Sequence, residues 1–471
     1  MNPFKKSFPY SAFVLICFAT IIGIAGCAVV GPNYLRPETD TPKAWNNKLS
    51  AGTKTETAEP QMLAQWWKTL NDPVLSGLIE RAVTGNSDIK NAFARIREAR
   101  ARRGISDADR FPSADGSGAV TARRSNGSEN KSYTIGVDAS WELDLFGGVS
   151  RSIEAAQANL ESEQENLRNV RVSLLAEVAL NYIDVRTYQT RISVANANLA
   201  AQEETYGLAR SRYQAGLGDE LAVQQARYNL EQTRSRIPTL QSSLEAAENR
   251  LAVLLGESPG ALRSLLKSPQ PVPVPSVNIA VGIPADLLRR RPDIRQAERN
   301  LAAQTARIGV AESELYPKFT LSGSVGLEAL SSGDLFSADS RSHSFGPRFS
   351  WRIFDAGAIR QNIEVQSASA EQALLRYESS VLNALEEVEN ALTAYVAEQQ
   401  RGQTLTAATR AAQEASKLAG NKYSAGLTDF DTVLEAQRSL LNLEDQLAES
   451  KGNTTADLVR LYKALGGGWG E

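Results

Sequence analysis

Apolar residues recur every seven positions in two long, proline-free stretches, residues 150–213 and 358–423. Sustained heptads predict long helices packed side by side, each on the order of 95 Å at about 1.5 Å per residue. Return helices are expected over residues 220–255, where Pro238 predicts a kink, and over residues 430–465. The heptad positions are Val178, Val185, Ile192, Leu199, Tyr206 and Tyr213 in the first stretch, and Val381, Val388 and Tyr395, beside Leu385 and Leu392, in the second.

Between the helical stretches, apolar and polar residues alternate, which predicts β-strands. The alternation runs through residues 132–143, 319–328 and 344–353, and more weakly through 114–122. Strands of about ten residues suit a tilted bilayer crossing, with aromatic residues near the two interfaces. A soluble sandwich with one buried face is the alternative. Two hairpins far apart in the chain, each flanked by long helices, favour the membrane interpretation.

The same order of elements occurs twice. Residues 141–256 align without a gap with residues 351–466, so that Trp141 matches Trp351 and RYQAGLGDELAV matches KYSAGLTDFDTV. Residues 87–112 also match residues 292–317. The period is too long for a solenoid and predicts a duplicated unit of long helix, tip and long helix. Shared helical composition is the alternative, but a repeated Tyr-x-Ala-Gly-Leu-x-Asp block is not helical filler.

The first residues are typical of a secretory signal, because Lys5 and Lys6 precede an apolar run that ends in small residues. Cys27 directly after Ala-Gly resembles a bacterial lipobox, in which the thiol is lipidated and the chain is cut before it. Acyl chains at Cys27 would anchor the mature chain, and Ala28 in place of Asp favours outer-membrane sorting. An ordinary signal peptide with a chance cysteine is the alternative. No cofactor other than this lipid is expected.

Composition narrows the classes of function. The mature chain would keep only Cys27 and has one histidine, His343, which excludes an internal disulfide and argues against metal clusters and histidine-based catalysis. The net charge is −3, and the sequence has no basic stripe that would indicate nucleic-acid binding. It also has no Walker A sequence, which argues against a nucleotide site. After the signal, no apolar run reaches the roughly 18 residues of a spanning helix, so any membrane crossing is expected to use strands. An enzyme is not expected.

The number of predicted strands has a consequence for assembly. Four strands cannot close a barrel, and an open sheet edge is not tolerated in lipid. The chain is therefore expected to share a barrel with copies of itself. Two copies would give eight strands around a packed interior, whereas three would give twelve strands with room for a pore. We favour three copies.

The predicted tips are residues 214–219 and 424–429. Gly216 and Gly426 allow a sharp reversal of the chain. Leu217 and Leu427 are apolar residues at an expected turn surface, which fits a docking contact; turn chemistry alone is the alternative. The copies differ in charge just beyond the tip. The second has Asp429, Asp431 and Glu435 where the first has Asp219, Leu221 and Gln225.

Several motifs are specific only in combination. Together with the lipobox and the duplication, they resemble the TolC-like outer-membrane efflux factors, in the lipoprotein (NodT-type) branch that serves resistance–nodulation–division pumps. The resemblance implies a mainly α fold with membrane β. Three chains would share a 12-stranded β-barrel, four strands per chain, and a long periplasmic α-helical barrel with coiled-coil tips. The motifs are GPNYLRP (31–37), WWKTLNDPVLSGLIERA (66–82), KYSAGLTDFDTVLEAQRSL (422–440) and LYKALGGGW (461–469).

The resemblance also implies the function and the partners. It implies an outer-membrane exit channel of a tripartite pump, which passively conducts small molecules such as drugs and opens on docking to a periplasmic adaptor. The implied partners are two further copies, the adaptor (a membrane fusion protein), an inner-membrane resistance–nodulation–division transporter and outer-membrane lipid. The implied periplasmic gate consists of Lys422, Tyr423, Asp431 and Glu435.

Three other functions remain as alternatives. A periplasmic adaptor or structural coiled-coil lipoprotein would usually carry one helical hairpin and no strands of bilayer length. An outer-membrane duct of type I protein secretion is a second alternative, but the lipobox and the terminal motif favour the small-molecule pump. A lipoprotein hydrolase is the third, and the lack of a nucleophile elbow argues against it.

We divide the chain into six parts. They are a signal peptide (1–26), an extended lipidated segment (27–60), a first repeat (61–256), a proline-rich connector (257–283), a second repeat (284–466) and a C-terminal tail (467–471).

Overall fold

The computed structural model describes residues 29–39, 42–46, 53–54, 60–125, 128–274, 279–280 and 284–469. Cys27 and the predicted signal lie outside these residues. The chain separates into two compact units, and each unit takes segments from both repeats. The strand unit holds residues 29–38, 95–164 and 296–378, and the tip unit holds the described residues of 39–94, 165–295 and 379–471.

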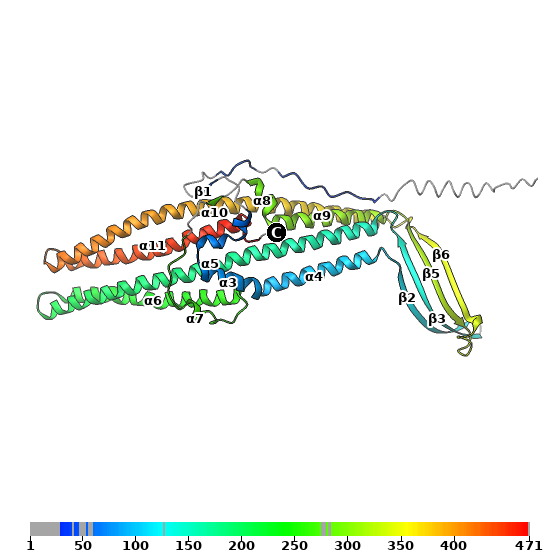
Figure 1. Cartoon of the computed structure of the whole chain (residues 1–471), viewed down its shortest axis with the longest axis horizontal. Coiled ribbons are helices and arrows are strands. Elements are labelled where there is room, and N and C mark those ends of the chain that lie inside the picture. The colour runs from blue at the N-terminus through cyan, green and yellow to red at the C-terminus, as the bar shows by residue number, and fades with distance from the viewer. Residues whose placement is uncertain are drawn as a thin grey trace, which may run out of the picture. The chain divides into compact units, whose positions relative to one another are not determined.

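The strand unit contains one antiparallel sheet in the order β2-β3-β5-β6 (Figure 1). The strands are β2 (Ser113–Ser125), β3 (Ser128–Leu143), β5 (Lys318–Ala329) and β6 (Arg341–Ser350), with a short 3-10 helix, η2 (Ala338–Ser340), before β6. All four predicted strands are confirmed, including the weak candidate that becomes β2. The central pair joins the two repeats, because β3 of the first hairpin lies beside β5 of the second.

The register places apolar side chains on one face of this sheet. Residues directly opposite each other point to the same face, and Val137 pairs with Val325 while Trp141 pairs with Leu321. Many of these side chains are open to the surroundings: Val137 is 54% exposed, Val325 70% and Phe345 78%. A contiguous exposed apolar face of this kind marks a membrane or protein contact.

The predicted end of the last strand is wrong. The alternation suggested a strand to residue 353, but β6 ends at Ser350. Trp351 leaves the sheet and its indole Nε1 donates to the carbonyl oxygen of Leu315 at 3.0 Å. Trp141 makes the equivalent bond to the Arg110 carbonyl at 2.9 Å. These matched residues therefore fasten each strand to the end of the preceding helix in both repeats.

The helices of the strand unit include parts of the two longest in the chain. They are the greater parts of α4 (Ser87–Ala108) and α9 (Pro292–Ser313) and the first parts of α5 (Gly148–Gln214) and α10 (Ala358–Ser424). Helices α5 and α10 are each 67 residues long. The Asp144 carboxylate accepts from backbone N–H groups in the first turn of α5, and Asp355 does the same for α10. Such caps satisfy amides that have no partner within the helix.

The N-terminal segment, residues 29–38, is extended, as predicted, and it lies along helices of the strand unit. The Tyr34 ring packs on Ala158, Ala302 and Ala303, and its hydroxyl donates to Glu298 at 3.2 Å. Burial and the neighbouring Glu298 carboxylate raise the pKa of Tyr34. Charged side chains hold both ends of the segment: Arg151 donates to the carbonyls of Val30 and Gly31, and Arg36 pairs with Glu298.

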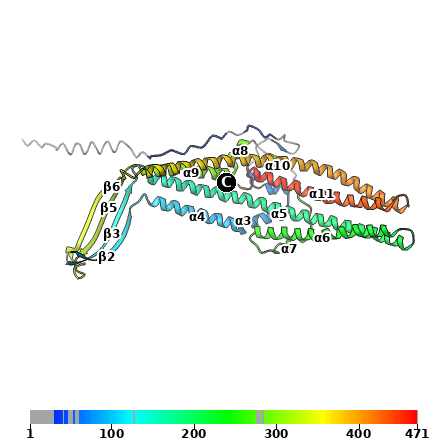
Figure 2. The same cartoon turned by 180° about the vertical axis from the view of Figure 1, so that it is seen from behind.

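The tip unit is built on two antiparallel helical hairpins, each with its two helices side by side (Figures 1 and 2). Helix α5 returns as α6 (Glu220–Leu254), and α10 returns as α11 (Phe430–Ala464). The predicted heptad positions Val178, Val185 and Val388 are fully buried, whereas Tyr213, at the tip end of the first series, is 44% exposed. Helix α6 continues through Pro238 as one helix. Among the described residues, none of the helices has a stretch both long and apolar enough to cross a membrane.

Smaller elements complete the tip unit. The predicted proline-rich connector is mostly non-helical where it is described, apart from the single turn α7. A parallel pairing of β1 with β4, which the sequence did not predict, joins residues 53–54 to the connector. The elements are β1 (Thr53–Lys54), α2 (Pro60–Ala64), η1 (Trp66–Leu70), α3 (Pro73–Gly85), α7 (Arg263–Leu266), β4 (Ile279–Ala280) and α8 (Pro284–Arg290).

A buried polar network attaches the connector to α5. Arg186 is 1% exposed and donates to the Tyr182 hydroxyl and the Ser268 carbonyl, each at 3.0 Å. The Tyr182 hydroxyl donates to the Asp72 carboxylate at 2.6 Å. Burial and this bond raise the pKa of Tyr182. A buried guanidinium is stable only when its donors are satisfied, so the network requires the connector to be in place.

Candidate functional site at the helical tips

The two tips have the same backbone geometry. Gly216 and Gly426 both have φ of 73°, a left-handed conformation that favours glycine. The amide of Leu217 donates to the Arg212 carbonyl at 2.8 Å, and the amide of Leu427 donates to the Lys422 carbonyl at 2.8 Å. Together with the glycine amide bonds, these form a Schellman motif, which ends a helix by satisfying its last carbonyls. The predicted role of both glycines in the reversal is confirmed.

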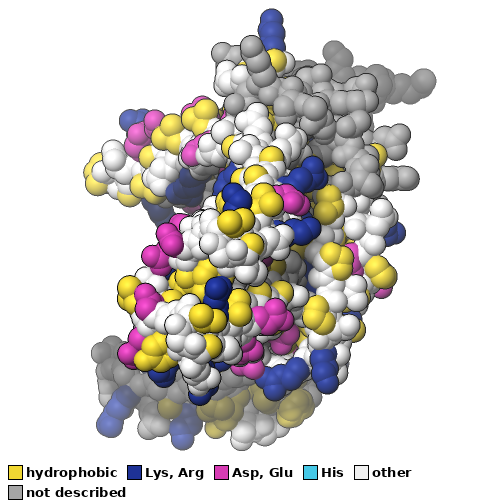
Figure 3. Space-filling view, turned by 90° about the vertical axis from the view of Figure 1, so that its left-hand side faces the viewer, with side chains coloured by type: hydrophobic (Ala, Val, Ile, Leu, Met, Phe, Trp, Pro, Cys, Tyr) yellow, Lys and Arg dark blue, Asp and Glu magenta, His cyan; other side chains and the backbone are white. Residues whose placement is uncertain are grey.

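The tip leucines point outward. Leu217 is 72% exposed and Leu427 is 76% exposed. At the end of the molecule that carries the tips, hydrophobic side chains reach the surface among acidic and basic ones (Figure 3). In this arrangement both leucines are available to a partner protein, and their docking role stays a prediction.

The turns differ at the start of the return helix. The Asp219 carboxylate accepts from the Ala222 amide at 2.8 Å and caps α6. Asp429 stands at the matching position before α11, but its side chain makes no capping hydrogen bond. The second return helix instead begins with Phe430, which is buried. The first return helix is therefore held by its cap, and the second by packing.

An aromatic and cationic contact joins the two hairpins near the tips. Tyr423 lies 5.1 Å from the Phe430 ring between centroids. The Arg212 guanidinium lies 4.7 Å above the Tyr423 ring and Nη1 donates to the Tyr423 carbonyl at 3.3 Å. This contact buries a small apolar cluster that includes Val223 and Leu434. A cation over a tyrosine face contributes about 0.5–1 kcal/mol at a partly exposed site.

The four predicted gate residues do not form one cluster within a single chain. Tyr423 belongs to the contact between hairpins, and Glu435 pairs with Arg438 on its own helix at 3.3 Å. Lys422 and Asp431 are exposed, and neither side chain has a hydrogen bond or ion pair with any residue that the structure describes. Their role at a gate stays a prediction, because closure was expected between copies.

Sequence reasoning missed the residues that connect the hairpins. Arg212 matches Lys422 in the repeat, so the alignment marked the position without showing that its side chain reaches the other copy. Farther from the tips, Arg438 donates to Asn229 at 3.0 Å, and Arg191 binds the Asp445 carboxylate at 2.8 Å and 2.9 Å. Periodicity carries no signal for such polar contacts between helices.

Over the described ranges, no group of three His, Cys, Asp or Glu side chains is arranged to hold a metal ion.

The fold therefore defines a class of protein in which a sheet with an exposed apolar face is combined with two long helical hairpins. The family model of the outer membrane efflux protein matches residues 78–257 and 283–467. The chain belongs to this family and is an outer-membrane efflux channel.

Individual relatives cover nearly the whole chain. Nodulation protein T of Rhizobium leguminosarum bv. trifolii is 34% identical over 455 residues, which are 95% of each protein. A probable efflux pump outer membrane protein of Pseudomonas putida, TtgC, is 32% identical, covering 98% of this chain and 96% of its own length. The solved outer-membrane channel OprN has a TM-score of 0.88 at 38% identity, with 94% of this chain and 100% of that chain covered.

Proposed function

We propose that three copies of this chain form the passive exit duct of a tripartite efflux pump. The observation that carries the proposal is the sheet: β2 and β6 are its edges, and neither pairs with a second strand among the described residues. Unpaired backbone groups are very costly in lipid. If the sheet lies in the membrane, β6 of one copy must pair with β2 of the next, and the ring must close.

Three copies satisfy this condition with room for cargo. Strands of ten to sixteen residues are long enough to cross a bilayer at a tilt. Eight strands give an interior that side chains fill, whereas twelve strands leave a larger lumen. Two similar hairpins per chain then give a periplasmic end with pseudo-sixfold symmetry. Leu217 and Leu427 would recur around that end as the contact for a periplasmic adaptor.

The protein mass of the intact complex tests the assembly. The complex is purified from outer membrane in mild detergent, and the detergent contribution is subtracted. We expect three chains. A monomer that is stable in the same detergent would contradict the proposal, because its two sheet edges would have nothing to pair with.

The gate of this duct is proposed to lie at the second hairpin. Asp431 and Glu435 are exposed acids that threefold symmetry would repeat around the axis, with Lys422 and Tyr423 as their partners. Docking of the adaptor would shift the balance from the closed to the open arrangement. The energy for transport would come from the inner-membrane transporter, and Cys27 would carry the lipid that anchors the chain.

Conductance in a planar bilayer tests the gate. The double variant Asp431→Asn, Glu435→Gln is expected to raise basal conductance. Glu220→Gln is the matched control, since this acid follows the first tip. Unchanged closure of the double variant, or an equal rise in the control, would remove these acids from the gate.

A further inference from the structure

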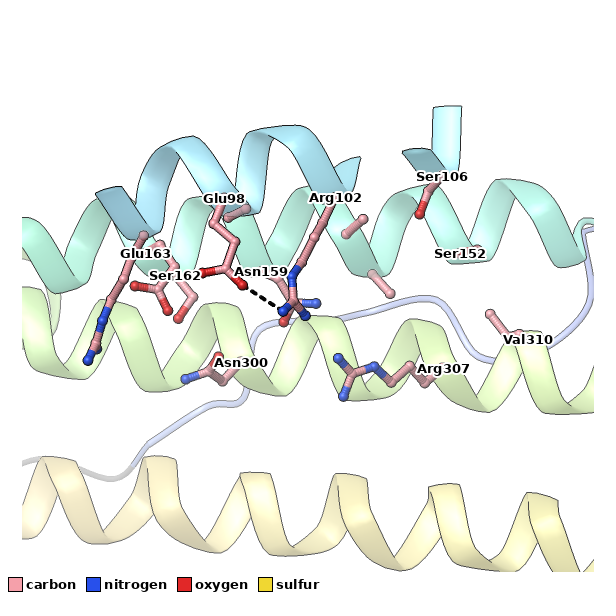
Figure 4. Close-up of a pocket in the computed structure, with 14 residues that line it drawn as sticks. Glu98, Arg102, Ser106, Ser152, Asn159, Ser162, Glu163, Asn300, Arg307 and Val310 are labelled. Atoms are coloured by element: carbon pink, nitrogen blue, oxygen red, sulfur yellow. Dashed lines mark hydrogen bonds and ion pairs between the residues drawn. The ribbon is translucent and has the colours of Figure 1, made fainter. Parts of the chain in front are cut away.

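Three helices of the strand unit, α4, α5 and α9, line a groove with a cavity of about 630 Å³. Arg102 extends into this groove from α4, and Arg307 extends into it from the facing helix α9 (Figure 4). Asn159 of α5 and Asn300 of α9 supply amide groups to the same space. The lining carries three arginines, Arg95, Arg102 and Arg307, and two glutamates, Glu98 and Glu163, so guanidinium groups outnumber carboxylates.

The charges of the groove are only partly compensated. Arg102 pairs with Glu98 at 2.6 Å, one helical turn away. Arg307 is half-buried, and no ion pair or hydrogen bond joins its side chain to any residue in the described part of the chain. Arginine is always charged and presents donors in a planar fork that fits carboxylate and phosphate groups. Arg307 therefore has free donors where a ligand can reach them.

Helix α9 contacts the N-terminal segment and the groove with different residues. Helix α9 uses Glu298 and Ala302 to hold that segment. Asn300 and Arg307 lie seven residues apart, two turns along the helix, and both line the groove instead. Arg307 also lines an adjoining cavity of about 520 Å³, together with Arg352. Arg307 thus stands where two cavities meet on a face that the segment leaves open.

We propose that this groove is an anion-binding station, in which Arg307 and Arg102 bind a carboxylate or phosphate group of a molecule in transit. The side-chain amide Nδ2 groups of Asn159 and Asn300 donate further hydrogen bonds to the anion. The description of the ligand as cargo rests on the proposed function. Anion binding itself depends only on the groove.

Labelling of a cysteine introduced into the groove tests whether the groove attracts anions. Ala156 lines the groove without a polar group, and the sequence contains no cysteine beyond Cys17 and Cys27. The full-chain complex carrying Ala156→Cys is labelled with an anionic and a cationic methanethiosulfonate, and the complex without this change gives the background. Replacing Arg307 by Gln should lower the ratio of anionic to cationic labelling rates about threefold, because it removes a nearby positive charge.

Protection by ligands shows whether anions bind. Inorganic pyrophosphate and octanoate serve as the phosphate and carboxylate probes, at constant ionic strength because salt screens the field. One of them should slow labelling by the anionic reagent about twofold at half occupancy, and the Arg307→Gln variant should lose this protection. Protection by pyrophosphate alone assigns the station to phosphate groups, and protection by octanoate alone assigns it to carboxylates.

The controls separate this proposal from its alternatives. Arg97→Gln removes an exposed charge on α4 that does not line the groove, and Arg307→Lys keeps the charge. No protection by either probe, equal protection in Arg307→Gln, or equal effects of Arg97→Gln and Arg307→Gln would overturn the station. The labelling needs no conductance, so its failure leaves the exit duct standing. If the purified protein is a monomer, the exit duct is contradicted, but the labelling result is unaffected.

Discussion

The first and second hairpins end in the same turn, but the helices that leave the two turns present different side chains. Gly216 and Gly426 share a φ of 73°. Beyond the tip, Leu221 is 63% exposed in the first hairpin, where the second has the exposed acid Asp431. Duplication has therefore kept what the backbone needs in order to reverse, while the outer surface has diverged. Contacts that differ between the two hairpins are expected among the divergent positions, whereas Leu217 and Leu427 recur at both tips.

The same contrast applies inside the tip unit. Arg186 of α5 binds the connector and also bonds to Tyr182, and the matching positions of α10 are the apolar Val396 and Leu392. The buried network around Arg186 thus has no counterpart at the matching positions of α10. Four predictions test how far the two repeats are equivalent, from the largest expected effect to the smallest.

The largest effect is expected from Arg186→Ala. The change leaves the Tyr182 hydroxyl and the Ser268 carbonyl without their buried partner, and breaking such a network costs about 3–5 kcal/mol. Hydrogen exchange of the α5 amides around residue 186 measures the loss. Val396→Ala is the matched change in the second repeat and should cost about 1 kcal/mol. Equal losses would show that the network has no special role.

Gly216→Ala and Gly426→Ala should weaken the two tips equally. A Cβ in the left-handed conformation costs about 1–2 kcal/mol. Faster exchange of the Leu217 and Leu427 amides, which donate the bonds that close each turn, reports the change. A clear difference between the tips would break the structural equivalence of the repeats.

The caps should behave unequally. Asp219→Ala removes a side-chain bond to the Ala222 amide and should destabilise the start of α6 by about 1 kcal/mol. Asp429→Ala removes no capping bond, so the start of α11 should change by only a few tenths of a kcal/mol at most. Exchange rates in the first turns of the two return helices measure both effects. Equal destabilisation would mean that Asp429 caps its helix in the assembly.

The smallest effect concerns pH and the acid Asp457 of α11. Burial raises the pKa of Asp457 above its ordinary 3.8, against the opposing charge of Arg460. The folded chain then holds this proton more tightly than the unfolded chain, so the contribution to stability falls as the pH rises from about 4. Asp457→Asn should flatten this part of the dependence of heat-induced dissociation on pH. An unchanged slope would exclude Asp457 as its source.

The sequence by itself determined the elements that depend on local repetition. Heptads set the long helices because apolar residues must recur on one helix face, and alternation set the strands for the same reason at a period of two. The tip glycines were visible because only glycine adopts the required backbone conformation at low cost. These features need no knowledge of what lies across the fold.

Only the tertiary structure decided which distant groups meet. The pairing of β3 with β5, the contact of Arg212 with Tyr423, and the attachment of Ser268 to Arg186 each join residues far apart in the chain. The end of β6 was also decided by a distant partner, the Leu315 carbonyl that binds Trp351. A polar side chain has many equivalent partners in sequence, and only the packed backbone brings one of them within hydrogen-bond distance.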